Sequence, residues 1–179
     1  VEGTELDGPG HGRTGYSEIT DNDIRDGGLV FHSAVGILLR NTFENVIAHN
    51  RVANLFYTGI SLGWSWGYKE TASRENLIFR NRIHNIGRGL LSDLGAIYVL
   101  GLQPGTRIAE NHISGVRLQS YGGWGIYLDE GSSHIVVEGN LVHDVQGPCF
   151  NIHYGRENIA RRNLFIGTAG GIASVGRAE

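Results

Sequence analysis

A short pattern of apolar and polar positions recurs along most of the chain. An apolar residue is followed by two variable residues, an asparagine, one variable residue and a second apolar residue, as in Ile78, Asn81 and Ile83. Successive asparagines of this pattern lie 23 to 31 residues apart. They are Asn22, Asn50, Asn81, Asn111, Asn140 and Asn163.

Repeats of this length, built from short β-type runs and Gly or Asn turns without a helical period, are typical of a parallel β-helix. Adjacent coils of such a solenoid are about 4.8 Å apart. We therefore expect each asparagine to lie above the next and to hydrogen-bond its neighbour's side chain and the turn backbone. The chain is predicted to be an all-β solenoid of about six coils.

Two further positions of the repeat are informative. Asn54, Asn85, Gly115 and Asp144 each precede another apolar residue and are predicted to be turn residues between two short strands. Later in each repeat comes a strand-like segment, as in Gly59-Ile60-Ser61-Leu62.

Strand alternation sorts these later segments into two faces. The inward side chains are predicted to be Ile60, Leu62, Ile97, Val99, Ile126, Leu128, Phe150 and Ile152. One outward column is predicted to contain Ser61, Tyr98, Tyr127 and Asn151, and the next Gly63, Leu100, Asp129 and His153.

Composition narrows the possible partners. The 179 residues carry a net charge of −3, and Lys69 is the only lysine, so no basic stripe is available to follow a phosphate backbone. Nucleic acid is therefore not expected as a partner. No stretch approaches the roughly 20 apolar residues that span a bilayer. The single cysteine, Cys149, is expected to be a buried structural thiol.

The histidines do not suggest a metal site. His84 and His143 occupy the same repeat position two coils apart, a separation of about 9.6 Å that is too long to share one ion. No metal or other cofactor is predicted.

Residues 1–15 are expected to form an irregular entry segment, and residues 16–179 a partial β-helix repeat domain. The chain begins with Val1 and shows no capping element, which favours a fragment of a longer solenoid.

Three insertions rich in aromatic and acidic residues, 63–75, 87–95 and 117–125, are predicted to be loops on the binding face. In the first of them, Trp64, Trp66 and Tyr68 supply rings that can stack on sugars. The alternative is that the tryptophans only pack this loop onto the coil.

Two carboxylates are expected to converge near these loops. Asp93 comes just before the strand of Tyr98, and Asp129 ends the corresponding strand one coil later. Glycoside hydrolysis needs two such groups, one to protonate the leaving oxygen and one to act as nucleophile or base. An Asx turn at Asp93 and a solvated acidic turn at Asp129 are the alternatives. His153, one coil above Asp129, is placed to orient it.

One apparent motif is discounted. The glycines and serine of 59–63 have nucleophile-elbow spacing, but that motif needs a strand, a strained turn and a helix. Here the segment is a repeat strand.

The blocks 59–67, 92–98, 125–133 and 153–158, taken in order, resemble the right-handed parallel β-helix proteins of bacterial polysaccharide degradation, and in particular glycoside hydrolase family 141. The family includes an α-L-fucosidase and xylan-active enzymes with two catalytic aspartates. The resemblance implies Asp93 and Asp129 for these roles, without assigning which is the acid. The expected substrate-binding residues are Trp64, Trp66, Tyr98, Trp124, Tyr127, Glu130, His153 and Tyr154.

The sequence thus predicts a secreted or periplasmic bacterial glycosidase, fucosidase-like or xylanase-like, with a glycan substrate. A polysaccharide lyase or epimerase is a less favoured alternative, because the chain has one lysine and lacks an Asp-rich cluster of the kind that binds calcium. A non-catalytic carbohydrate-binding or adhesion solenoid and a purely structural solenoid are further alternatives. The oligomeric state is left open.

Overall fold

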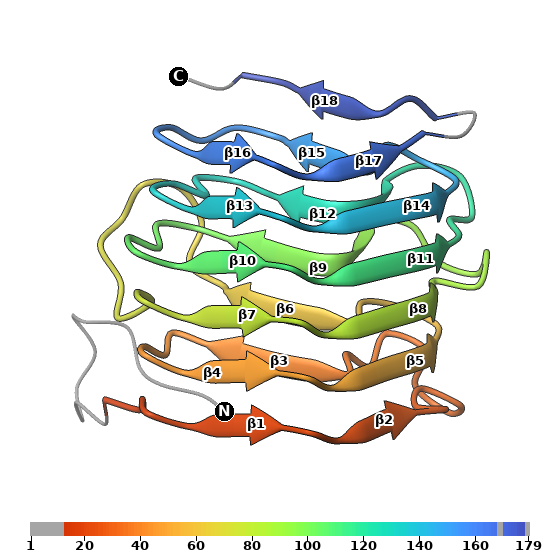
Figure 1. Ribbon diagram of the computed structural model, residues 1–179, viewed down its shortest axis with the longest axis horizontal. Helices are drawn as coiled ribbons and strands as arrows, with labels where there is room; N and C mark the ends of the chain where they lie inside the picture. Colours follow the sequence, from red (N-terminus) through yellow and green to blue (C-terminus); the bar gives the residue numbers. More distant parts are fainter. Residues whose placement is uncertain (1–12, 168–169, 178–179) are drawn as a thin grey trace.

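The computed structural model describes residues 13–167 and 170–177. All regular elements in these ranges are β-strands, and they form three sheets of six strands each (Figure 1). Most of the predicted entry segment, residues 1–12, lies outside the described residues.

The strands of the three sheets alternate along the chain. The first sheet contains β1 (Glu18–Thr20), β4 (Val46–Ala48), β7 (Leu77–Phe79), β10 (Arg107–Ala109), β13 (Val136–Glu138) and β16 (Ile159–Arg161). The second contains β2 (Asp23–Arg25), β5 (Arg51–Leu55), β8 (Arg82–Ile86), β11 (His112–Val116), β14 (Leu141–Val145) and β17 (Leu164–Ile166). The third contains β3 (Ile37–Arg40), β6 (Ile60–Gly63), β9 (Leu94–Leu100), β12 (Gly123–Leu128), β15 (Phe150–Ile152) and β18 (Ala173–Val175).

Each set of three consecutive strands makes one coil, and every strand pairs in parallel with its counterpart in the next coil (Figure 1). Six coils stack in this way within the described chain. The predicted all-β parallel solenoid is confirmed.

The core runs along the axis of the solenoid. The predicted inward residues of the third sheet are buried, from Ile60 in β6 to Phe150 in β15, and Ile152 packs against them. The first and second sheets supply matching ladders, such as Ile78 above Ile47 and Ile83 above Val52. Like side chains therefore stack on like side chains, and the core has no single centre.

The repeated asparagines form a continuous hydrogen-bonded ladder between the first and second sheets. Asn81 is typical: its Oδ1 accepts from both the backbone N–H and Nδ2 of Asn50, each at 3.0 Å. Its own Nδ2 donates to Oδ1 of Asn111 at 3.0 Å and to the backbone oxygen of Ile47 at 2.9 Å. All four hydrogen-bonding positions of the buried amide are thereby satisfied. The structural role predicted for this series is confirmed.

One sequence prediction is corrected. Asn54, Asn85, Gly115 and Asp144 were predicted to separate two strands, but they lie inside β5, β8, β11 and β14. Each has a positive φ, between 53° and 67°. The left-handed residue bends the strand without ending its parallel pairing, because the apolar residue after it is again in register.

Candidate functional site

The two predicted columns on the outer face of the third sheet have the expected register. Tyr98 in β9 pairs with Ser61 in β6 and with Tyr127 in β12, which in turn pairs with Asn151 in β15. These side chains are nevertheless buried, with exposed fractions of 8% or less. Trp64 and Trp124 pack against Tyr98 and Tyr127, so the column lies beneath other side chains.

Trp64 comes from the predicted loop after β6, whereas Trp124, also predicted to lie in a loop, is the second residue of β12. The ring of Trp64 stacks on Tyr98, with a centroid separation of 5.9 Å and an interplanar angle of 17°. Trp124, at the start of β12, lies 3.9 Å from Tyr127 between centroids. Tyr98 therefore lies beneath Trp64 and donates its hydroxyl hydrogen to Asp129.

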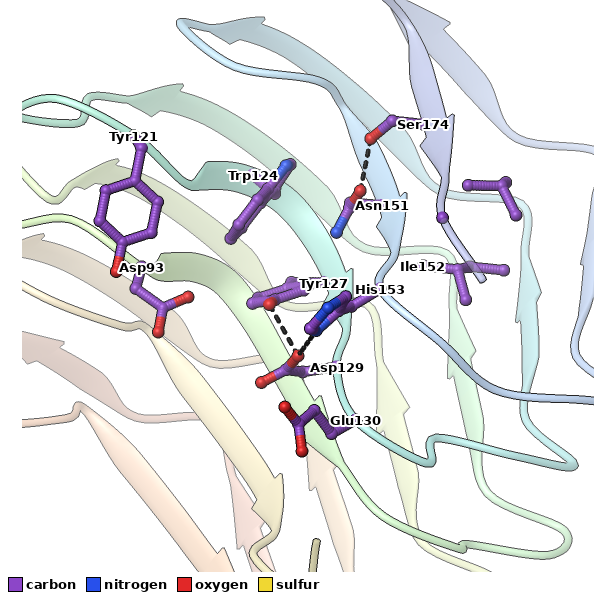
Figure 2. Close-up of a pocket in the computed structure, with 12 residues that line it drawn as sticks. Asp93, Tyr121, Trp124, Tyr127, Asp129, Glu130, Asn151, Ile152, His153 and Ser174 are labelled. Carbon is purple, nitrogen blue, oxygen red and sulfur yellow. Dashed lines mark hydrogen bonds and ion pairs between the residues drawn. The ribbon is translucent and has the colours of Figure 1, made fainter. Parts of the chain in front are cut away.

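Beside this layer lies a cavity of about 550 Å³ over β12, β15 and β18, which we call the acid cavity (Figure 2). Both aspartates predicted to be catalytic line it, together with Glu130 from the turn after β12. The structure thus brings the predicted acids to one cavity. The other lining residues are Tyr121, Trp124, Tyr127, Asn151, Ile152, His153, Ser174, Val175 and Gly176.

Asp129 follows β12 and is 7% exposed, with three side chains hydrogen-bonded to its carboxyl group. Tyr98 donates to Oδ2 at 2.5 Å, and Tyr127 donates to Oδ1 at 2.7 Å. Nδ1 of His153, one coil further along, lies 2.9 Å from Oδ1, as the predicted register requires. The carboxyl group is held from three directions and its orientation is fixed before any ligand binds.

The two phenols remain donors over a wide pH range. Burial, together with the hydrogen bond to Asp129 and its charge, raises the pKa of both Tyr98 and Tyr127 far above the usual tyrosine value. Each hydroxyl therefore keeps its proton at neutral and alkaline pH.

Asp93 reaches the cavity from the bend just before β9. Its φ is 57°, a left-handed value that Asp tolerates better than most residues. The backbone N–H of Asp93 donates to the carbonyl of Tyr121 at 3.2 Å, and the hydroxyl of Tyr57 donates to the carbonyl of Asp93 at 2.8 Å. These main-chain contacts fix the bend and leave the carboxyl group directed into the cavity (Figure 2).

The environment of Asp93 favours its neutral form. Burial makes the largest contribution and raises the pKa of the carboxyl group, and the negative charge of Asp129 raises it further. His153 acts in the opposite direction. The two aspartates therefore line the same cavity, but their carboxyl groups have different local environments.

Of the other predicted binding residues, Glu130 lines the acid cavity and is contacted by Tyr154, and Trp64 and Trp66 lie at a second cavity. Glu130 accepts a 3.3 Å hydrogen bond from the hydroxyl of Tyr154, whose ring packs edge-to-face on Tyr68. Trp64 and Trp66 line a separate cavity of about 490 Å³, the tryptophan groove. Its other lining residues are Ser33, Val35, Leu38, Arg40 and Tyr57.

Sequence reasoning missed several residues of the acid cavity. Tyr121 comes from the loop before β12, and Ser174 lies in β18, where its hydroxyl donates to the amide oxygen of Asn151 (Figure 2). Ser174 could have been found by extending the column of Asn151 by one repeat. Tyr121 carries no such signal, because its position depends on the conformation of a loop.

Other candidate chemistry is absent from the site. Ser61 is fully buried within β6 and donates to the carbonyl of Tyr98, so it is not an exposed nucleophile. Cys149 is buried, as predicted. Nε2 of His112 lies 2.9 Å from Nε2 of His143 on the second sheet, away from the acid cavity. Among the described residues, no three His, Cys, Asp or Glu side chains are grouped to hold a metal ion.

A model of the family described as "Right handed beta helix region" matches residues 72–179, and the chain belongs to this family. The solenoid is therefore a right-handed parallel β-helix. No curated protein sequence matches the chain significantly. No helix among the described residues is long and apolar enough to cross a membrane.

A solved structure titled "Glycoside hydrolase" has the same fold. It superposes with a TM-score of 0.69 at 23% sequence identity, over 92% of this chain. The chain spans about a quarter of that protein, since the match covers 26% of its length.

Proposed function

We propose that the protein is a glycoside hydrolase that acts on an oligosaccharide or polysaccharide, with Asp93 as the general acid and Asp129 as the nucleophile or general base. The observation that supports this proposal is the pair of carboxyl groups that face one cavity from different environments. Glycosidases separate the two roles in this way, by keeping one carboxyl group protonated and the other ionised.

The contacts of Asp129 suit an ionised group. Both tyrosine hydroxyls donate hydrogen bonds to its carboxyl oxygens, and His153 makes a third polar contact. Such donors stabilise negative charge and hold the reactive oxygen in place. The constraint would keep Asp129 aligned with an anomeric carbon.

The environment of Asp93 suits a proton donor. Its raised pKa extends the pH range over which the carboxyl group keeps a proton. Its backbone is fixed at both the N–H and the carbonyl, while its carboxyl group makes no hydrogen bond that competes with a leaving oxygen among the described contacts.

Similarity to known proteins also supports a glycan substrate. The structural neighbour bears the name glycoside hydrolase, and the blocks that resemble glycoside hydrolase family 141 contain both aspartates. More specifically, we propose a fucosidase-like or xylanase-like activity of a secreted or periplasmic protein.

The test uses the full-length protein and a panel of aryl glycosides, xylan and fucosylated oligosaccharides. Asp93→Asn and Asp129→Asn are compared with Asp144→Asn, a control whose aspartate has a similar φ of 53° but lies on the second sheet. Loss of turnover in the first two variants alone supports the proposal. Normal turnover of xylan or of a fucosylated oligosaccharide by either variant contradicts the pair, and binding without turnover by the wild type indicates a carbohydrate-binding solenoid.

The two roles can be told apart by the leaving group. Dinitrophenolate leaves without protonation, so Asp93→Asn should keep kcat/KM for a dinitrophenyl glycoside close to the wild-type value, whereas Asp129→Asn should not. The reverse result would exchange the two assignments.

A further inference from the structure

The tryptophan groove and the acid cavity lie on the same face of the third sheet. Leu38, which lines the groove, pairs with Ser61 and so belongs to the column that continues through Tyr98 and Tyr127. The groove lies over β3 and β6, and Asp129 follows β12. Three strand spacings separate β3 from β12, about 14 Å. The two hollows are therefore successive positions along the stack of coils.

Two aromatic residues connect the groove to the acids. Trp64 lines the groove and stacks on Tyr98, which donates to Asp129. Tyr57 also lines the groove, and its hydroxyl donates to the carbonyl of Asp93. Each of the two aspartates is thus connected to a residue of the groove through aromatic side chains.

The groove has the chemistry of a sugar-binding surface. Trp66 is 59% exposed and packs edge-to-face on Trp64, with ring centroids 5.9 Å apart. The exposed ring of Trp66 presents a flat apolar surface, and Ser33 and Arg40 provide polar groups in the same groove. Sugar rings have apolar faces with hydroxyl edges, which match such a surface.

We propose that the tryptophan groove is a second sugar-binding subsite, which holds another part of the glycan chain whose glycosidic bond lies at Asp93 and Asp129. This inference rests on the proposed function. The substrate is then an extended oligosaccharide or polysaccharide, because one sugar ring does not reach from the groove to the acid cavity.

The test measures affinity and kcat/KM as a function of chain length. Xylo-oligosaccharides from the disaccharide to the hexasaccharide and a matched series of fucosylated oligosaccharides are titrated into the full-length protein. Trp66→Ala should bind the longest members of the recognised series roughly tenfold more weakly, from the loss of one stacked ring. The loss should be smaller for the shortest member, so that it grows with chain length.

Two further variants serve as controls. Trp66→Phe keeps an aromatic face and should retain most of the affinity for long chains. Tyr16→Ala removes another exposed ring, one that packs on Phe43 outside the groove, and should change neither affinity.

Other results would separate the two proposals. Equal losses on short and long chains, or no loss on either, would overturn the subsite, as would the absence of any binding of both series by the wild type. Length-dependent binding through Trp66 without hydrolysis would keep the subsite as a binding surface and overturn the catalytic proposal alone.

Discussion

The hydroxyl of Tyr98 lies 2.5 Å from Oδ2 of Asp129, one coil further along the solenoid. This contact joins two neighbouring coils through a single pair of side chains. It arises because β9 and β12 are in register and place the tyrosine column beside the aspartate. Stacking geometry thus produces a preorganised carboxyl group without a dedicated loop.

Removing this hydroxyl should impair turnover more than folding. In Tyr98→Phe, Asp129 loses one of two phenol donors while the ring still stacks under Trp64. We expect kcat/KM to fall roughly 10- to 100-fold, the range for loss of one charge-assisted hydrogen bond. Steady-state kinetics would measure the fall, and thermal unfolding would verify the fold.

Tyr154→Phe is the matched control for this change. Its hydroxyl makes a longer bond of 3.3 Å to Glu130, so its loss should have a smaller effect. Equal effects in the two variants would contradict a special role for the contact between Tyr98 and Asp129.

The pH profile should identify the proton donor. Because the pKa of Asp93 is raised by burial and by the charge of Asp129, the acid form persists to a higher pH than for an exposed aspartate. Activity should decline as the pH rises through this raised pKa. The alkaline limb should be present in the wild-type kcat/KM for an oligosaccharide and absent for a dinitrophenyl glycoside, and an equal limb with both substrates would assign it to another group.

The same carboxyl group should lower stability at neutral pH. A folded-state pKa above the unfolded value means that the folded protein binds more protons between the two values, so stability falls as the pH rises through the folded pKa. Asp93→Asn removes the penalty, and asparagine tolerates the φ of 57°. The variant should have the higher melting temperature at pH 7, and the difference should shrink in acid.

Thermal unfolding at several pH values would measure this effect. Asp144→Asn, at a similar φ but exposed and paired with Arg117, should show no such gain. A lower melting temperature of Asp93→Asn at neutral pH would show that the aspartate is stabilising.

The asparagine ladder should be most sensitive at its buried middle. Asn81→Ala removes an amide with four hydrogen-bonding contacts and takes away the side-chain acceptor of the buried N–H of Asn50. The free energy of unfolding should fall by about 2–4 kcal/mol, the range for unsatisfied buried polar groups. Asn22→Ala, at an exposed position, should cost less than about 1 kcal/mol. Urea denaturation of both variants would test the difference.

The fold could be predicted from the sequence because the same pattern of asparagine and apolar residues recurs in every coil. The spacing of Asn50, Asn81 and Asn111 gives the coil length, and alternation gives the inward residues. The sequence also misled in one respect, since Asn54 and Asn85 have turn chemistry but lie inside strands. A left-handed residue bends a strand here, and composition alone does not distinguish that bend from a turn.

The candidate site was predictable where it depends on register and unpredictable where it depends on loops. The contact between Asp129 and His153 follows from counting residues along two strands. The burial of Tyr98 beneath Trp64, the position of Tyr121 and the division of the face into two hollows do not. They depend on how three loops fold back over the sheet, which no periodic pattern encodes.

A ladder that sets the coil spacing on one side of the solenoid frees the other side to vary. The amides of Asn50, Asn81 and Asn111 join successive coils at the turns between the first and second sheets, while the segment of Trp64 and Trp66 follows β6 in the third sheet. A change in this segment beyond Trp64 would alter the tryptophan groove, whereas a change at Trp64 itself would also reach Asp129 through Tyr98. Under the proposed function, a substitution at Trp66 should change glycan preference, and one at Trp64 should change turnover as well.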